Sequence, residues 1–502
     1  MNPTLIRLRS SAICVLALVC ALHSHATDWP AFRGIREDGV AEGDKSPAHF
    51  GPSSNILWKT ELLPGHSSPV ISKDLLFVTG CEGSKLTTIS LDRRTGKKLW
   101  EQSVAADKLE PIHKSNSHAT STPVTDGKVV YTYFGSIGLL AYDFAGKELW
   151  RKALPIPKTF FDQGTGTSPI LAEGKLLVFV QRGKDSHILA VNPQDGAEIW
   201  KAAMPDYNNS YSTPIIWKEE AKGFVGIACA TRFTAFGLLD GKEQWWVNDI
   251  GYQACSTPVV TGDRLIITAA GVQGDVSNMT PPPTFEEIIK QYDRDGDGLI
   301  AYEEIPVELL YTDRHAAQGQ GNMSVRQALG MFGGVKTHEK LDRERYMQIR
   351  ERLVGFRTGK MNRTVALCVR TGGTGDVTDS HVVWKETKGV PEVPSPLVWQ
   401  GRLYLIRSGG LLVCSDVETG KLIYENRIDA PGGYFASPIV AGGRIYVASD
   451  RGTVTVIKAG DTFAILARND LADPITASPV IVANTLYIRS SAKLWAFADQ
   501  SN

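Results

Sequence analysis

Three aspartates at alternate positions and one glutamate are concentrated in residues 293–304. The aspartates are Asp293, Asp295 and Asp297, and Glu304 ends the stretch. Carboxylate oxygens are preferred ligands of calcium, and a tight loop with this spacing can direct several of them at one ion. The pattern therefore predicts a calcium site.

The other positions of this stretch fit the twelve-residue loop of an EF-hand. Gly298 stands at position 6, where the loop turns sharply, and Leu299 would contribute its backbone carbonyl at position 7. Ala301 at position 9 has no side-chain oxygen, so water should fill that place. The alternative is a solvated acidic turn, which would need neither the glycine nor all five ligand positions. The predicted metal ligands are Asp293, Asp295, Asp297, Leu299 and Glu304.

Helices are expected on both sides of this loop. Thr284 and Glu287 have the spacing of a capping box, which predicts a helix over residues 285–292. A second helix is expected over residues 303–311, with Pro306 in its first turn, where proline does least harm.

A second, degenerate loop is expected near residues 334–345, because EF-hands usually occur in pairs. Its positions 3 and 12 would be Lys336 and Arg345, which cannot bind calcium. A helix should follow over residues 346–356. This loop would pack against the first one without coordinating metal.

Two short phrases repeat through the rest of the chain. The first is a hairpin, as in residues 141–150, where Asp143 and Gly146 suit the turn and Trp150 ends the second strand. The second is Ser or Thr, then Pro, then an apolar strand. A residue before proline is extended, and proline is tolerated at the first position of a strand. The prolines of this second phrase are Pro69, Pro123, Pro169, Pro214, Pro258, Pro396, Pro438 and Pro479.

These prolines lie 41 to 54 residues apart, except for the step from Pro258 to Pro396. A period in the forties with four strands per unit is typical of a β-propeller. The predicted fold class is all-β, an eight-bladed β-propeller of four-stranded antiparallel blades with a small α-helical EF-hand insertion. A strand over residues 55–62, which contains Trp58, should complete the last blade and close the ring.

The long step divides the chain into parts. The predicted domains are a signal peptide (1–26), a first part of the propeller (27–271), the EF-hand insertion (272–361) and a second part of the propeller (362–502). The insertion follows the second strand of its blade, so it should leave the propeller on the face where the blades begin. It would either overhang the mouth of the central channel or project outwards on proline-rich tethers. The residues expected at this mouth are His66, His118, Gln163, Tyr211, Gln253 and Tyr434.

The N-terminal residues have the pattern of a secretory signal peptide. Arg7 and Arg9 precede an apolar run over residues 12–22, and Ser24 and Ala26 are small residues suited to cleavage after position 26. We expect export to the periplasm or the extracellular space, with an uncut anchor as the alternative. Five cysteines would remain, with no CxxC pair, which favours single buried thiols. The 54 basic and 54 acidic residues cancel, so no net field attracts nucleic acid.

The blade repeats resemble the PQQ-binding-like propeller repeats shared by PQQ-dependent alcohol dehydrogenases and the assembly factor BamB. Residues 28–34 (DWPAFRG) and 58–69 resemble secreted BamB-like propellers more closely still. The resemblance implies the fold but no activity, because this group contains both enzymes and scaffolds. It also implies that a dehydrogenase would carry adjacent cysteines over its quinone, together with a Glu–Asn–Asp calcium site. This chain has no adjacent cysteines, and the second set cannot be placed.

We therefore predict a secreted, non-enzymatic, calcium-binding propeller that acts as a binding or assembly scaffold. No catalytic residue is assigned, and PQQ is not expected as a cofactor. The expected partners are calcium and a protein or carbohydrate on one propeller face, and the chain should not span a membrane. The alternative is a PQQ-dependent or other oxidoreductase with its site in the central funnel.

Overall fold

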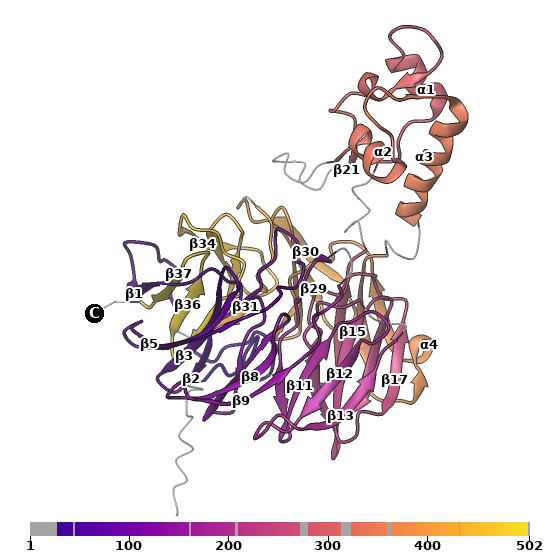
Figure 1. The fold of residues 1–502 in the computed structure, drawn as a ribbon. Coiled ribbons are helices and arrows are strands. Elements are labelled where there is room, and N and C mark those ends of the chain that lie inside the picture. The colour runs from indigo at the N-terminus through magenta and orange to yellow at the C-terminus, as the bar shows by residue number, and fades with distance from the viewer. Residues whose placement is uncertain are drawn as a thin grey trace, which may run out of the picture.

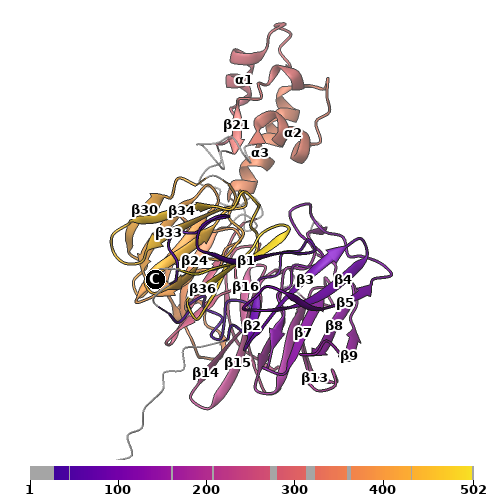
Figure 2. The same ribbon diagram turned by 90° about the vertical axis from the view of Figure 1, so that its left-hand side faces the viewer.

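The chain folds into an eight-bladed β-propeller, as the repeats predict (Figures 1 and 2). The computed structural model describes residues 28–43, 46–159, 162–205, 209–271, 280–312, 323–358, 363–430 and 432–499. The predicted signal peptide lies outside the described residues. Each blade is a four-stranded antiparallel sheet, and one blade gains a fifth strand, β25 (Gly375–Asp376), which pairs in parallel with β17.

In seven blades the strands follow one another outwards from the central channel in chain order, and the last blade takes β1 as its outer strand. The first four blades are β2–β5 (Val70–Ser72, Leu75–Glu82, Lys85–Asp92, Lys98–Ala105), β6–β9 (Val124–Thr125, Val129–Phe134, Gly138–Asp143, Glu148–Ala153), β10–β13 (Ile170–Ala172, Lys175–Val180, His187–Val191, Glu198–Ala203) and β14–β17 (Ile215–Glu219, Lys222–Cys229, Arg232–Gly237, Glu243–Asn248). The other four are β18, β19, β24 and β26 (Val259–Thr261, Arg264–Ala269, Val365–Arg370, Val382–Glu386), β27–β30 (Leu397–Trp399, Arg402–Arg407, Leu411–Asp416, Leu422–Arg427), β31–β34 (Ile439–Ala441, Arg444–Ala448, Thr453–Lys458, Ile465–Asp470) and β35–β37 with β1 (Val480–Val482, Thr485–Arg489, Lys493–Phe497, Ile56–Glu61).

The first strand of the chain closes the ring. β1 pairs antiparallel with β37, with Lys59 opposite Trp495, and so becomes the outer strand of the last blade. The prediction from the sequence is confirmed. Closure removes two sheet edges that would otherwise be open to pairing with another chain.

The turn glycines and outer-strand tryptophans hold neighbouring blades together. Trp150 of β9 lies over Gly196 in the last turn of the next blade, and its Nε1 donates to the Pro193 carbonyl (2.8 Å). Gly196 has a φ of 72°, and a Cβ built there would lie only 2.9 Å from the Trp150 ring. The turn therefore requires glycine both for its conformation and for this close approach. Trp58, Trp100, Trp200 and Trp384 make the same contacts with the blades that follow them.

The residue before each repeated proline also joins its blade to the next. The Thr122 hydroxyl accepts a hydrogen bond from the Ser68 backbone N–H (2.9 Å), and Ser168 accepts one from Thr122 (3.0 Å). The series returns to its start where Ser68 accepts from Ser478 (3.1 Å). We call this closed set the hydroxyl ring. It consists of Ser68, Thr122, Ser168, Thr213, Thr257, Ser395, Ser437 and Ser478.

The segment before β1 crosses the central channel. Trp29 bridges to Ile71 of the first blade, and the Pro30 carbonyl accepts from Thr125 of the second (2.9 Å). Further along, Arg33 donates to the Pro396 carbonyl on the opposite side of the ring (2.7 Å). Because these blades lie on opposite sides of the ring, residues 28–43 tie them together across the channel.

A small helical unit lies between β19 and β24 and has a core of its own (Figure 1). Its chain departs at Ala270, which bridges to Gln253 just before a repeated proline, so the unit is attached on the predicted face. Its elements are α1 (Phe285–Tyr292), β20 (Ile300–Ala301), a 3₁₀ turn η3 (Tyr302–Glu304), β21 (Leu310–Thr312), β22 (Met323–Ser324), α2 (Val325–Gly333), β23 (Lys340–Leu341) and α3 (Arg343–Thr358). One further short helix, α4 (Thr378–His381), lies on the propeller before β26.

Two helix predictions in this unit need correction. The capping box and the helix over 285–292 are confirmed as α1. The helix predicted over 303–311 is wrong, because only η3 forms before Pro306, and the chain then continues into β21, which pairs with β22. The helix predicted to begin at Tyr346 begins three residues earlier, at Arg343.

Among the described residues, no helix is long and apolar enough to cross a bilayer. The five described cysteines form no disulfide. Cys229, Cys368 and Cys414 are buried, whereas Cys81 and Cys255 are partly exposed. The expectation of single thiols is therefore confirmed, and that of full burial holds for three of them.

Candidate functional site

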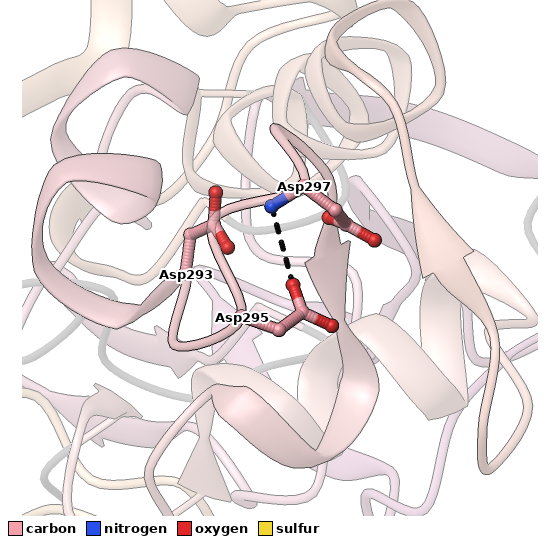
Figure 3. Close-up of side chains that lie close together, drawn as sticks. All are labelled: Asp293, Asp295 and Asp297. Carbon is pink, nitrogen blue, oxygen red and sulfur yellow. Dashed lines mark hydrogen bonds between the residues drawn. The ribbon is translucent and has the colours of Figure 1, made fainter.

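The acidic loop brings three carboxylates together (Figure 3). One oxygen from each of Asp293, Asp295 and Asp297 lies within 4.8 Å of the others. The Asp293 carboxylate accepts from the backbone N–H groups of Gly296 (2.8 Å) and Gly298 (3.0 Å), which folds the chain back around it. Asp295 accepts from the Asp297 N–H (3.3 Å), the bond drawn in Figure 3. Such a cluster of oxygens suits a hard cation.

Glu304 is the last residue of the loop, and its side chain is buried. Its Oε1 accepts from the Arg294 N–H and its Oε2 from the Ala301 N–H, both at 2.8 Å. Both carboxylate oxygens are thus directed back at the loop backbone, outside the group of three aspartates. The backbone N–H of Leu299 donates to the Asp297 carboxylate (2.9 Å).

A lysine from elsewhere in the unit lies against the aspartates. Lys340 Nζ donates to Asp295 Oδ2 (2.6 Å) and also contacts Asp297. Lys340 belongs to β23, and β23 pairs with β20, with Ile300 opposite Leu341. Ile300 is at position 8 of the segment 293–304, and Leu341 is at position 8 of the segment 334–345. The two loops are therefore paired at equivalent positions.

A central funnel of about 400 Å³ opens between the blades. The hydroxyl ring surrounds it, Phe32 of the crossing segment lies in its wall, and Phe435 and Tyr211 add further aromatic surface. Glu392 is the only Asp, Glu, Lys or Arg side chain in the described lining. The segment crossing the channel thus contributes to a pocket whose wall is polar but almost uncharged.

Four of the six residues expected at the mouth line this funnel: His66, Gln163, Tyr211 and Gln253. His118 and Tyr434 do not. The Tyr434 hydroxyl donates to the Ala430 carbonyl (3.0 Å), and His118 Nδ1 is buried without a hydrogen-bond partner among the described residues. Burial, followed by the charge of Arg489, lowers the pKa of His66 to about 4, so this ring is neutral at pH 7.

The sequence analysis missed Phe32, Phe435 and Glu392. Phe435 follows Tyr434 directly and lies three residues before Pro438, the spacing that His66 and Tyr211 have from their own prolines. Phe32 lies outside the repeats, and its only sequence signal was the DWPAFRG stretch.

A family model described as outer membrane protein assembly factor BamB matches residues 50–280 and 374–494. The chain belongs to this family. The BamB match stops before the helical unit and resumes after it, so the acidic loop lies outside the matched residues. A comparison with curated protein sequences finds no significant match.

Solved structures share the BamB-type propeller at low sequence identity. The quinohemoprotein alcohol dehydrogenase from Comamonas testosteroni is 13% identical, with a TM-score of 0.54 over 95% of this chain and 81% of the other. A europium-containing methanol dehydrogenase is 10% identical, with a TM-score of 0.52 over 94% and 98%. BamB from Moraxella catarrhalis is 13% identical, with a TM-score of 0.49 over 89% and 99%. The two dehydrogenases show a common fold with this chain, and identities this low carry no activity over to it.

Proposed function

We propose that this protein is an exported, non-enzymatic β-propeller scaffold whose helical unit is an EF-hand pair that binds one calcium ion. The convergence of Asp293, Asp295 and Asp297 in a loop of EF-hand spacing carries the calcium part. Membership of the BamB family supports the scaffold part, and the signal-like residues 1–26 support export. The partner would be a protein bound to one propeller face.

In this proposal the three aspartates each supply a side-chain oxygen, and Leu299 supplies its backbone carbonyl. Glu304 would release the N–H groups of both Arg294 and Ala301 and turn both oxygens to the ion. Water would occupy the position of Ala301. The second loop, with Lys336 and Arg345 at ligand positions, would support the first through β20 and β23 without binding metal.

Calorimetric titration of the mature chain with calcium tests the site. One ion should bind with a dissociation constant of about 10⁻⁴ to 10⁻³ M, the range of extracellular EF-hands. Glu304→Gln should weaken binding at least about tenfold, because one charge and one bidentate ligand are lost. Glu303→Gln is the matched control and should bind like the parent. Equal binding by the Glu304→Gln variant would exclude this loop as the site.

The alternative is an oxidoreductase that uses the funnel, and the shared fold with quinohemoprotein dehydrogenases is what favours it. PQQ carries three carboxylates, whereas the described funnel lining contains no Lys or Arg to pair with them. Adding PQQ and calcium to the purified chain should therefore give no alcohol oxidation with an artificial electron acceptor. Turnover that disappears when the quinone is removed would replace the scaffold proposal.

A further inference from the structure

The hydroxyl ring surrounds the funnel with hydrogen-bond donors that have no acceptor within the described part of the chain. Each of its eight hydroxyls accepts one N–H from a neighbouring blade. None donates to an acceptor among the described residues, although every member of the ring is 6% exposed or less. A hydroxyl can donate one hydrogen bond as well as accept, so each member of the ring has a donor left over. Water or a ligand in the funnel can supply the acceptors for these donors.

The remainder of the wall adds amide groups and aromatic surface. Gln163 and Gln253 line the funnel and offer both donors and acceptors. Phe32 and Phe435 provide flat apolar faces within the same cavity. A few polar groups placed around apolar surface are typical of small-molecule sites, and a volume of 400 Å³ lies in their usual range of about 300 to 1,000 Å³.

The charged groups of the funnel wall disfavour an anionic ligand. Glu392 contributes the only carboxylate, and the described lining contains neither Lys nor Arg to balance an anionic ligand. His66 and His113 are the only basic side chains in the described lining, and the His66 ring is neutral at pH 7. An anion would therefore be desolvated without a Lys or Arg of the described lining to pair with it, which is costly.

We propose that the funnel is a binding site for a neutral mono- or disaccharide. Sugar hydroxyls can accept from the hydroxyl ring and donate to Gln163 and Gln253, and the apolar face of a sugar ring can pack on Phe435 or Phe32. The funnel lining contains no residue of the acidic loop. Sugar binding and calcium binding can therefore be tested separately.

The test uses the full mature chain and ligand-observed saturation-transfer NMR. The neutral probes are glucose, galactose, N-acetylglucosamine, cellobiose, maltose and lactose, and the charged probes are glucuronate and glucosamine. At least one neutral probe should show transfer at 10 mM or below, a concentration we choose as about the limit of weak specific binding. Glucuronate should bind more weakly than the neutral sugars.

Two variants locate the binding in the funnel. Phe435→Ala removes an aromatic face, and Ser115→Trp fills the funnel from an exposed position in its lining. Each should weaken the best neutral probe at least about tenfold. Leu239→Ala, at a side chain that is 80% exposed outside the funnel, is the control and should leave binding unchanged. Absence of binding by every neutral probe, preference for a charged probe, or undiminished binding by both funnel variants would overturn the proposal.

Discussion

The ammonium group of Lys340 lies 2.6 Å from the Asp295 carboxylate and also contacts Asp297. The lysine comes from the second loop, and both aspartates belong to the first. A cation supplied by the protein therefore already neutralises part of the negative charge at the proposed calcium site. Calcium would have to displace this ammonium before it could use both carboxylates.

Lys340→Met should tighten calcium binding by about tenfold, because the ion would no longer compete with a neighbouring positive charge. Calorimetric titration at low ionic strength measures the change. Lys336→Met removes an exposed lysine of the same loop and should have a much smaller effect. Weaker binding by the Lys340→Met variant would show that the lysine supports the loop rather than competing for it.

The buried Glu110 should make stability depend on pH. Its Oε2 accepts from the N–H (3.0 Å) and hydroxyl (2.7 Å) of Thr165, whereas Oε1 has no partner within the described ranges. Burial raises the pKa of Glu110 to about 7, although the bonds from Thr165 act in the opposite direction. The folded state therefore holds this proton more tightly than the unfolded chain, where the pKa is near 4.5.

The stability that this proton contributes is complete below about pH 4.5 and is lost as the pH rises through 7. Relative to the parent, Glu110→Gln should gain on the order of 3 kcal/mol between pH 4 and pH 8. Chemical denaturation at both pH values measures this difference. Glu82→Gln, at an exposed glutamate, should gain nothing. A difference between Glu110→Gln and the parent that does not vary with pH would contradict the assignment.

The stability cost of a side chain that crowds Trp150 at position 196 can be measured separately from the cost of the backbone conformation. Gly196 and Gly174 both have a φ of 72°, but only Gly196 faces a tryptophan, because a Cβ at Gly174 would meet nothing within 4 Å. Gly174→Ala should cost about 1 kcal/mol through its backbone conformation alone. Gly196→Ala should cost about 1 to 3 kcal/mol more, because the ring must move. Equal losses in thermal denaturation would mean that the tryptophan adapts freely.

Ser168→Ala should open the hydroxyl ring at one point. The buried N–H of Thr122 would lose its only acceptor in the ring, at a cost of about 1 to 3 kcal/mol. Ser168→Thr keeps the hydroxyl and should stay close to the parent, since Ser and Thr share this role around the ring. Both variants are compared by their thermal midpoints, and a similar loss in the two would assign the effect to packing instead of the hydrogen bond.

The propeller could be predicted from sequence because its signals are local and repeated. The Ser or Thr before a proline recurs once per blade, and the contact of Trp150 with Gly196 recurs at four other blade junctions, so an error in one copy is corrected by the others. The helix predicted over 303–311 failed because its pattern occurs once, and the pairing of β21 with β22 decides the outcome. The contact of Lys340 with Asp295 could not be predicted, because it depends on how two separate loops pack.

The pairing of β1 with β37 has a consequence for how the chain is made. Asn55 and Asp499, which are joined by a hydrogen bond at the end of this pair, are separated by 444 residues. At a synthesis rate of about 5 to 20 residues per second, β1 has no partner for roughly 20 to 90 seconds. During that interval β1 is an unpaired strand, and the last blade lacks its outer strand. The closure that pairs β1 with β37 in the folded protein therefore leaves the nascent chain with an exposed strand until β37 has emerged.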